Sequence, residues 1–136
     1  MSKIRVLLAD DHKDLLDTVT RLLQTEFDVV GTVTNGKALI SAAERLKPSV
    51  VIADISMPIL NGLEAVRRLK ESGTQMQVVF LTIHDSSDYV RAAFATGALG
   101  FVVKTRLATD LRVAIKEVFA GRSYLSPSIA PQAIIP

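Results

Sequence analysis

The apolar residues of this 136-residue chain follow two alternating spacings. Short continuous apolar runs predict buried strands, and apolar residues three or four positions apart predict the helices between them. The runs predict strands at residues 4–9, 27–33, 49–54, 77–82 and 100–104. The helical spacing predicts helices at residues 15–23, 38–46, 62–72, 87–96 and 108–120. Five strands that alternate with five helices favour an α/β fold with a parallel sheet covered by helices on both faces.

Local signals mark where two of these helices begin and end. Pro48 predicts the end of the second helix, because the residue before a proline disfavours helical geometry. Asn61 is predicted to cap the third helix, with Glu64 completing a capping box. Gly73 is predicted to end that helix.

The length of the chain suits one domain, which we place at residues 1–121. Residues 122–136 are predicted to be a linker or tail, because SYLSPSIAPQAIIP contains three prolines and no periodic pattern. The chain has no cysteine, which excludes disulfides and thiolate metal sites and fits a reducing cytoplasm. Its net charge of +2 is too small to indicate nucleic-acid binding by itself. We find no signal peptide and no apolar run near the roughly 20 residues that span a membrane.

Polar residues stand where four of the predicted strands end. In an open parallel sheet, ligands bind beyond the carboxyl ends of the strands, so these side chains should meet in one pocket. The pocket would hold three carboxylates, one hydroxyl and one ammonium group. The residues are Asp10, Asp11, Asp54, Thr82 and Lys104.

Three carboxylates in a small site repel one another, and a divalent cation would relieve that repulsion. Oxygen ligands and retained waters suit Mg²⁺. Asp11 and Asp54 are the predicted direct ligands, with Asp10 acting mainly through a water. The chain leaving Asp54 brings the carbonyl group of Ser56 to the same site.

A magnesium ion held by acids takes phosphate oxygens as further ligands, which makes Asp54 a candidate nucleophile toward phosphorus. Phosphoryl transfer depends on positioning and on neutralising charge. We expect Mg²⁺ and Lys104 to neutralise the phosphoryl oxygens and the Thr82 hydroxyl to donate a hydrogen bond to one of them.

Simpler interpretations remain open for some of these residues. Asp10 and Asp11 could serve only as negative groups at the start of the helix near Lys13. We expect His12 to be a solvent-exposed residue and not a metal ligand. We expect His84 to be a loop residue at the entrance of the site and not a catalytic base.

Four motifs together resemble the CheY-like receiver domain of two-component response regulators. They are LLADDH, VVIADISMPILNGLE, VVFLT and GFVVK, and the resemblance covers about residues 3–121. It implies a three-layer, flavodoxin-like (βα)5 fold with strand order 2-1-3-4-5. It also implies a phosphorylation-dependent signalling switch whose only catalysis is its own phosphorylation and dephosphorylation.

The resemblance assigns a role to each site residue. Asp54 would be the phosphoacceptor, receiving its phosphoryl group from a sensor histidine kinase. The metal site would use Asp10, Asp11, Asp54 and Ser56. Thr82 and Lys104 would contact the phosphoryl group, and Phe101 would be the switch aromatic. On phosphorylation the Phe101 ring would turn inward and the surface of helix four, strand five and helix five would change shape.

The motifs LTIHD and GRSYLSP are most similar to the NarL/FixJ class, in which a DNA-binding helix-turn-helix domain follows the linker. The chain stops at residue 136, so that output domain is absent, and we expect a fragment and not a stand-alone receiver. DNA binding would occur only through that output domain, which would control transcription. A homodimer is left open, and no membrane contact is expected.

Two positions depart from the usual receiver pattern. Thr105 follows Lys104 where many receivers have proline, so the isomer of that peptide bond is left open. Ile83 follows Thr82 where many receivers have a small residue, so Ile83 is expected to restrict access to the phosphoryl group.

Other functions remain as alternatives. A haloacid-dehalogenase-like phosphatase also uses an aspartyl nucleophile, but its second acid stands two residues later, where this chain has Ser56. A flavin or nucleotide binder would need a phosphate-binding loop after the first strand, and no Gly-rich or hydroxyl-rich loop stands there. A degenerate receiver that only binds partners is disfavoured, because all five site residues are present.

Overall fold

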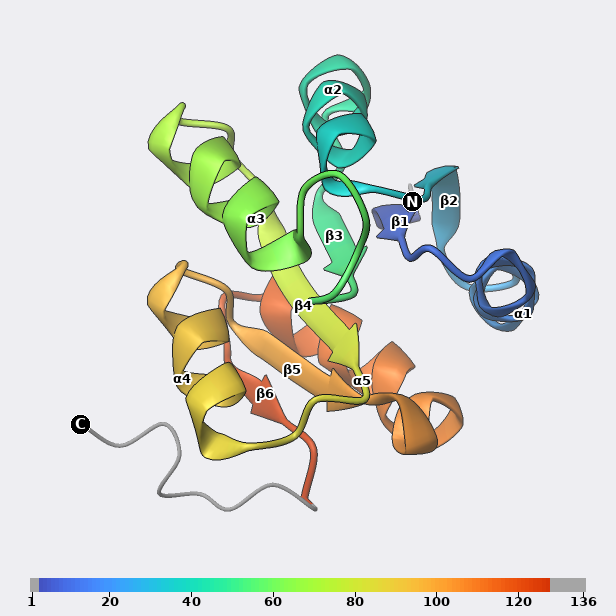
Figure 1. The fold of residues 1–136 in the computed structure, drawn as a ribbon. Helices are drawn as coiled ribbons and strands as arrows, with labels where there is room; N and C mark the ends of the chain where they lie inside the picture. Colours follow the sequence, from blue (N-terminus) through green and yellow to red (C-terminus); the bar gives the residue numbers. More distant parts are fainter. Residues whose placement is uncertain (1–2, 128–136) are drawn as a thin grey trace.

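Six strands of the computed structural model, which describes residues 3–127, form one parallel sheet in the order β2-β1-β3-β4-β5-β6 (Figure 1). The strands are β1 (Arg5–Ala9), β2 (Asp28–Val33), β3 (Val50–Ala53), β4 (Gln77–Thr82), β5 (Gly100–Val103) and β6 (Tyr124–Leu125). The helices are α1 (Lys13–Leu23), α2 (Gly36–Leu46), α3 (Gly62–Glu71), α4 (Ser87–Ala95) and α5 (Leu107–Phe119). A 3₁₀ turn, η1 (Lys104–Arg106), joins β5 to α5.

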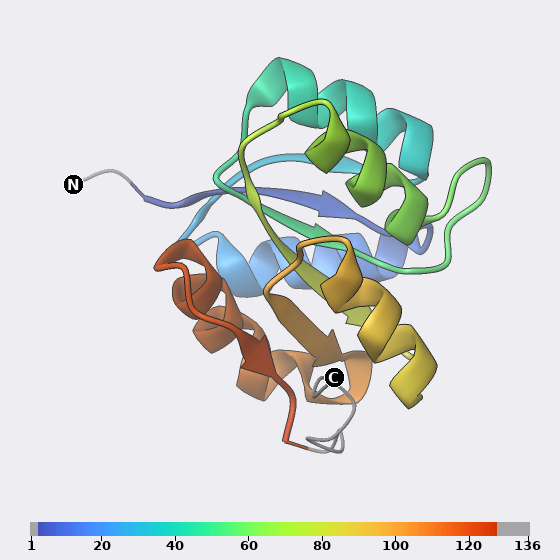
Figure 2. The same ribbon diagram turned by 90° about the vertical axis from the view of Figure 1, so that its left-hand side faces the viewer.

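The helices cover both faces of the sheet, so the molecule has three layers (Figure 2). Alternate residues of a strand point to opposite faces. Leu7 therefore packs in the core beneath α2, α3 and α4, whereas Leu8 packs in the core beneath α1 and α5. The β3 and β5 strands contain no polar side chain because both of their faces are buried.

The predicted flavodoxin-like architecture and strand order are confirmed for the first five strands. The sixth strand was not predicted. Tyr124 and Leu125 lie within the segment read as a linker or tail, and they pair with Gly100 and Phe101 at the edge of the sheet. The remainder of that segment, residues 128–136, lies outside the described residues.

The helix ends agree with most of the predicted signals. The α2 helix ends at Leu46, before Pro48, and the Asn61 side chain caps α3 by accepting a hydrogen bond from the Glu64 N–H at 2.8 Å. The second half of the predicted capping box is wrong, because the Glu64 carboxylate instead pairs with Arg67 and Arg68. Within residues 3–127, no helix combines the length and the apolar character that a membrane crossing requires.

Candidate functional site

The predicted site residues meet at the carboxyl ends of the central strands. Asp10 follows β1 and Asp54 follows β3, and both backbones are held by hydrogen bonds to neighbouring strands. The Asp10 N–H donates to Val33 at 3.0 Å, and the Asp54 N–H donates to Ala9 at 2.9 Å. Thr82 is the last residue of β4, so three parallel strands place their terminal residues at one edge of the sheet.

A glycine allows the loop after β3 to fold back on itself. The Gly62 N–H donates to the carbonyl oxygen of Ile55 at 2.8 Å. A Cβ atom added to Gly62 would lie 1.9 Å from the carbonyl oxygen of Asp54, so no side chain fits there. The intervening loop projects from the body of the molecule (Figure 2). Gly62 therefore couples the start of α3 directly to the backbone of Asp54.

Lys104 provides the central positive charge of the site. Its ammonium nitrogen lies 2.7 Å from Asp10 Oδ2 and 3.0 Å from Asp54 Oδ2. Burial alone would lower the pKa of Lys104, but hydrogen bonds and attraction from Asp54 and Asp10 outweigh it and raise the pKa above its ordinary value. Asp10 and Asp54 are both buried, so Lys104 already relieves part of the repulsion that we expected a divalent cation to relieve.

The acids also form a donor set that suits a metal ion. One ligand atom from each of Asp10, Asp11, His12 and Asp54 can be chosen so that all four lie within 4.8 Å of one another. The Ser56 N–H donates to Asp54 Oδ1 at 3.3 Å, so the backbone of Ser56 also lies at this site. The three carboxylates of this set fit Mg²⁺, which prefers oxygen ligands.

The two histidines make contacts that we did not predict from the sequence. His12 is exposed, as expected, but its Nδ1 lies 3.0 Å from Asp10 Oδ1 and 3.2 Å from Asp11 Oδ1. His84 Nε2 lies 2.8 Å from Ser56 Oγ, and its ring stacks on Tyr89 with the ring centroids 4.5 Å apart. The adjacency of Asp10, Asp11 and His12 in the sequence was a signal for the first contact, whereas no local signal links Ser56 to His84.

Thr82 and Phe101 are both buried. The Thr82 hydroxyl accepts a hydrogen bond from the His84 N–H at 3.1 Å. Phe101 is 0% exposed and packs in the same core cluster as Phe80 and Val90. The predicted inward turn of Phe101 therefore describes a position that the ring already occupies in this structure. Within the described residues no peptide bond is cis, so the bond after Lys104 is trans.

The acids open onto a surface depression of about 410 Å³. Its lining residues come from α1, from η1 and from the segments that follow β1, β3 and β4: Asp11, His12, Leu15, Asp54, Ser56, Ile83, His84 and Lys104. Ile83 is 71% exposed, so this bulky side chain stands at the mouth of the depression. A molecule that approaches Asp54 from solvent enters through this opening.

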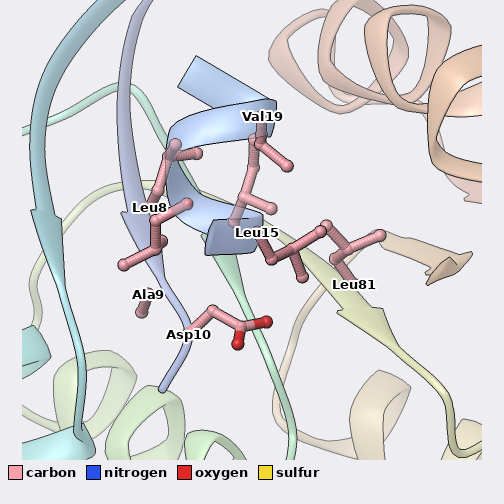
Figure 3. A pocket seen from close by; sticks show the side chains of 8 residues that line it. Leu8, Ala9, Asp10, Leu15, Val19 and Leu81 are labelled. Atoms are coloured by element: carbon pink, nitrogen blue, oxygen red, sulfur yellow. The ribbon is translucent and has the colours of Figure 1, made fainter. Parts of the chain in front are cut away.

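A separate cavity lies on the inner side of Asp10, between β1, α1 and β4 (Figure 3). Its volume is about 10 Å³, and apart from Asp10 its walls are apolar residues such as Leu8, Val19 and Leu81. A water molecule in this cavity would need two to four polar partners, which these walls do not supply. The depression, and not this cavity, is therefore the candidate ligand site.

The fold and this arrangement of acids, hydroxyl and lysine define a receiver domain. Residues 6–116 match the family model described as the response regulator receiver domain, and the chain belongs to that family. This assignment sets aside the dehalogenase-like phosphatase and the flavin binder.

Known relatives place the chain within the NarL/LuxR group of response regulators, as its motifs indicated. It is 35% identical to the transcriptional regulatory protein DegU of Brevibacillus brevis, over 98% of this chain and 57% of the relative. It is 34% identical to the nitrate/nitrite response regulator protein NarL of Escherichia coli K12, over 93% of this chain and 59% of the relative. The chain therefore spans about three-fifths of the length of these curated relatives.

Solved structures agree with this placement. A two-component response regulator of the LuxR family from Aurantimonas sp. SI85-9A1 has a TM-score of 0.90 and 30% identity, covering 98% of this chain and 96% of that one. The close match in both length and topology confirms the receiver fold.

Proposed function

We propose that Asp54 accepts a phosphoryl group from the phosphohistidine of a sensor histidine kinase. The observation that supports this most directly is the position of Lys104, whose ammonium group contacts the buried carboxylates of Asp10 and Asp54. Asp54 and Lys104 line a depression that is open to solvent, where a phosphodonor can reach Asp54. The chemistry acts only on the chain's own aspartate.

In the proposed step, a carboxylate oxygen of Asp54 attacks phosphorus while the bond between phosphorus and the donor nitrogen breaks. The electron pair leaves with the donor imidazole, and the product is an aspartyl phosphate. Asp10, Asp11, Asp54 and the Ser56 carbonyl would hold Mg²⁺, which supplies charge neutralisation for the phosphoryl oxygens when bound. Lys104 turns from carboxylate to phosphoryl oxygen, and the Thr82 hydroxyl donates a hydrogen bond.

Phosphorylation adds about −1.5 to −2 charge and three acceptor oxygens at Asp54, which biases the neighbouring elements toward a second arrangement. We propose that the surface of α4, β5 and α5 responds. Because Phe101 is already buried, the response can be a change in its packing without any change in its exposure. Nuclear magnetic resonance with beryllofluoride as phosphate analogue should shift the Phe101 ring signals, and unmoved signals would remove Phe101 from the switch.

The wider role follows from the relatives, of which this chain covers only part. We propose that the receiver acts in the cytoplasm and controls transcription through a DNA-binding output domain outside this sequence. We also propose that the receiver forms a homodimer. The molecular mass in solution should then double from monomer to dimer when beryllofluoride is added.

The phosphoacceptor can be tested with acetyl phosphate and MgCl₂, followed by intact mass spectrometry. We expect the mass to increase by one phosphoryl group in the wild-type chain and in Asp85→Asn, whose carboxylate is exposed on the loop after β4. We expect no increase in Asp54→Asn. Phosphorylation of Asp54→Asn at the wild-type rate would overturn the assignment.

A further inference from the structure

A second buried polar cluster lies outside the depression and joins η1, α5 and the residues after α5. It consists of Arg106, Asp110 and Ser126, which we call the Ser126 cluster. Asp110 is 2% exposed and Ser126 is 0% exposed. Burial of a charged group is costly unless hydrogen bonds satisfy it, so the contacts of this cluster need a reason.

The Ser126 hydroxyl bonds in two directions. Its oxygen accepts a hydrogen bond from the Val103 N–H at 3.2 Å, and the same hydroxyl donates to Asp110 Oδ2 at 2.8 Å. The Arg106 guanidinium donates to both carboxylate oxygens of Asp110, at 2.8 and 3.1 Å. Burial alone would raise the pKa of Asp110, but the hydrogen bonds from Arg106 and Ser126 outweigh it and lower the pKa. Asp110 is therefore held as a carboxylate.

These contacts fall at the two ends of η1, the turn that carries Lys104. Val103 directly precedes the turn and bonds to Ser126, while Arg106 ends the turn and bonds to Asp110. Between them, Lys104 extends its ammonium group to Asp10 and Asp54. The orientation of Lys104 is thus constrained by a turn that the Ser126 cluster clamps on both sides.

The sixth strand delivers Ser126 to this position. The Tyr124 N–H donates to Leu99 at 2.9 Å and the Ser126 N–H donates to Phe101 at 3.0 Å, which aligns β6 with β5 (Figure 1). Where the backbone pairing ends, the Ser126 side chain bonds to the next strand residue, Val103. The strand also lies beside α5, which carries Asp110 (Figure 2).

We propose that Ser126 and Asp110 are positioning residues for phosphorylation: they hold η1 so that Lys104 reaches the reacting carboxylate. This inference rests on the proposed function of Asp54 and Lys104. The segment after α5 then affects the chemistry of the site, because Ser126 in this segment helps to fix the position of Lys104. A change in how that segment is held would then change the rate of phosphorylation.

The first test compares phosphorylation rates with acetyl phosphate and Mg²⁺ at a temperature where every variant is folded. We expect Ser126→Ala and Asp110→Asn to be roughly tenfold slower or more, because small displacements of a positioned group have large effects on rate. The matched controls are Ser123→Ala, an exposed serine next to β6, and Glu117→Gln, which breaks the Arg122–Glu117 ion pair on α5. Both controls should keep the wild-type rate.

A double-mutant cycle with Lys104→Met separates positioning from general stability. If Ser126 acts through Lys104, Ser126→Ala slows the wild-type chain but has no further effect once Lys104 is replaced. The nitrogen signal of the Lys104 ammonium should also move in Ser126→Ala and stay in place in Ser123→Ala. Purely structural damage would lower the unfolding midpoint without producing this pattern.

Two results would overturn the inference. One is a wild-type rate in folded Ser126→Ala, and the other is an equal slowing by Ser126→Ala with and without Lys104. If Asp110→Asn does not fold, Ser126→Ala alone decides, because it removes a single hydroxyl. A wild-type chain that takes up no phosphoryl group would instead defeat the proposed function, so the two failures are distinguishable.

Discussion

At the scale of single residues, Ile83 is expected to limit access to Asp54. It stands at the mouth of the depression and is 71% exposed, so it contributes little to the core. Ile83→Ala should therefore increase the rate of phosphorylation by acetyl phosphate severalfold while leaving the free energy of unfolding nearly unchanged. Ile59→Ala is the matched control, because Ile59 is 73% exposed but does not line the depression. Equal rates in wild type and Ile83→Ala would refute the steric explanation.

Single residues also show what the sequence could predict about the site. Asp54 and Thr82 were predictable, because a polar residue at the carboxyl end of a buried parallel strand lies where an open α/β sheet binds its ligands. The bond from Ser126 to Asp110 was not predictable, because it joins residues 16 positions apart through a hydroxyl group that looks ordinary in the sequence. The contact of Lys104 with Asp10 depends on side-chain geometry that no spacing encodes.

At the scale of secondary-structure elements, the contact between β3 and α3 should tolerate no side chain at position 62. The Cβ atom of Gly62→Ala would overlap the Asp54 carbonyl oxygen, so α3 must move away from the site. We expect a loss of roughly 1–3 kcal/mol or more in the free energy of unfolding, together with slower phosphorylation.

Gly73→Ala is the control, because it also replaces a glycine by alanine but creates no overlap with another residue. Gly73 has a φ of 82° and an added Cβ would meet nothing within 4 Å, so alanine there strains only the local backbone. It should cost about 1 kcal/mol of stability and leave phosphorylation unchanged. The explanation fails if Gly62→Ala, once folded, is phosphorylated at the wild-type rate.

The junction of α5 and β6 should make stability depend on pH. The folded pKa of Asp110 lies below its ordinary value of about 4, so the unfolded chain binds a proton more readily. The stabilisation is fully present above about pH 4 and is lost as the pH falls through the lower, folded pKa. The groups that face Asp110 are Arg106, Tyr124 and Ser126.

Asp110→Asn tests this dependence. It should lower the free energy of unfolding by about 2 kcal/mol at pH 7, because Arg106 loses its charged partner. Urea unfolding of both chains from pH 7 to pH 3 should show the difference shrinking below about pH 4. A difference that stays constant over this range would show that the charge of Asp110 is not responsible.

Elements differ in how well the sequence predicts them. The five helices are long enough for the helical spacing of their apolar residues to identify them, and each of the first five strands contains an apolar run. The β6 strand has only two residues, Tyr124 and Leu125, which is too short for a pattern of apolar and polar residues to be recognised. Its position depends on pairing with the free edge of β5, which is a property of the folded sheet.

At the scale of the whole molecule, the stability of the fold should be linked to the charge balance of the site. Lys104 and a bound divalent cation would both neutralise the buried carboxylates, so each should matter more when the other is missing. Lys104→Met keeps an unbranched apolar side chain but removes the ammonium group. Without Mg²⁺ we expect it to lower the free energy of unfolding by about 2–3 kcal/mol, because two buried carboxylates lose their partner.

Adding Mg²⁺ should restore part of this loss, so the Mg²⁺-induced gain in unfolding free energy is larger in Lys104→Met than in the wild type. Urea unfolding over a series of MgCl₂ concentrations measures both gains. Lys37→Met is the control, since it removes the same formal charge from an exposed position and should respond to Mg²⁺ as the wild type does. Equal gains in all three chains would mean that Lys104 and the cation neutralise different charges, and that the acids at the strand ends do not act as one electrostatic unit.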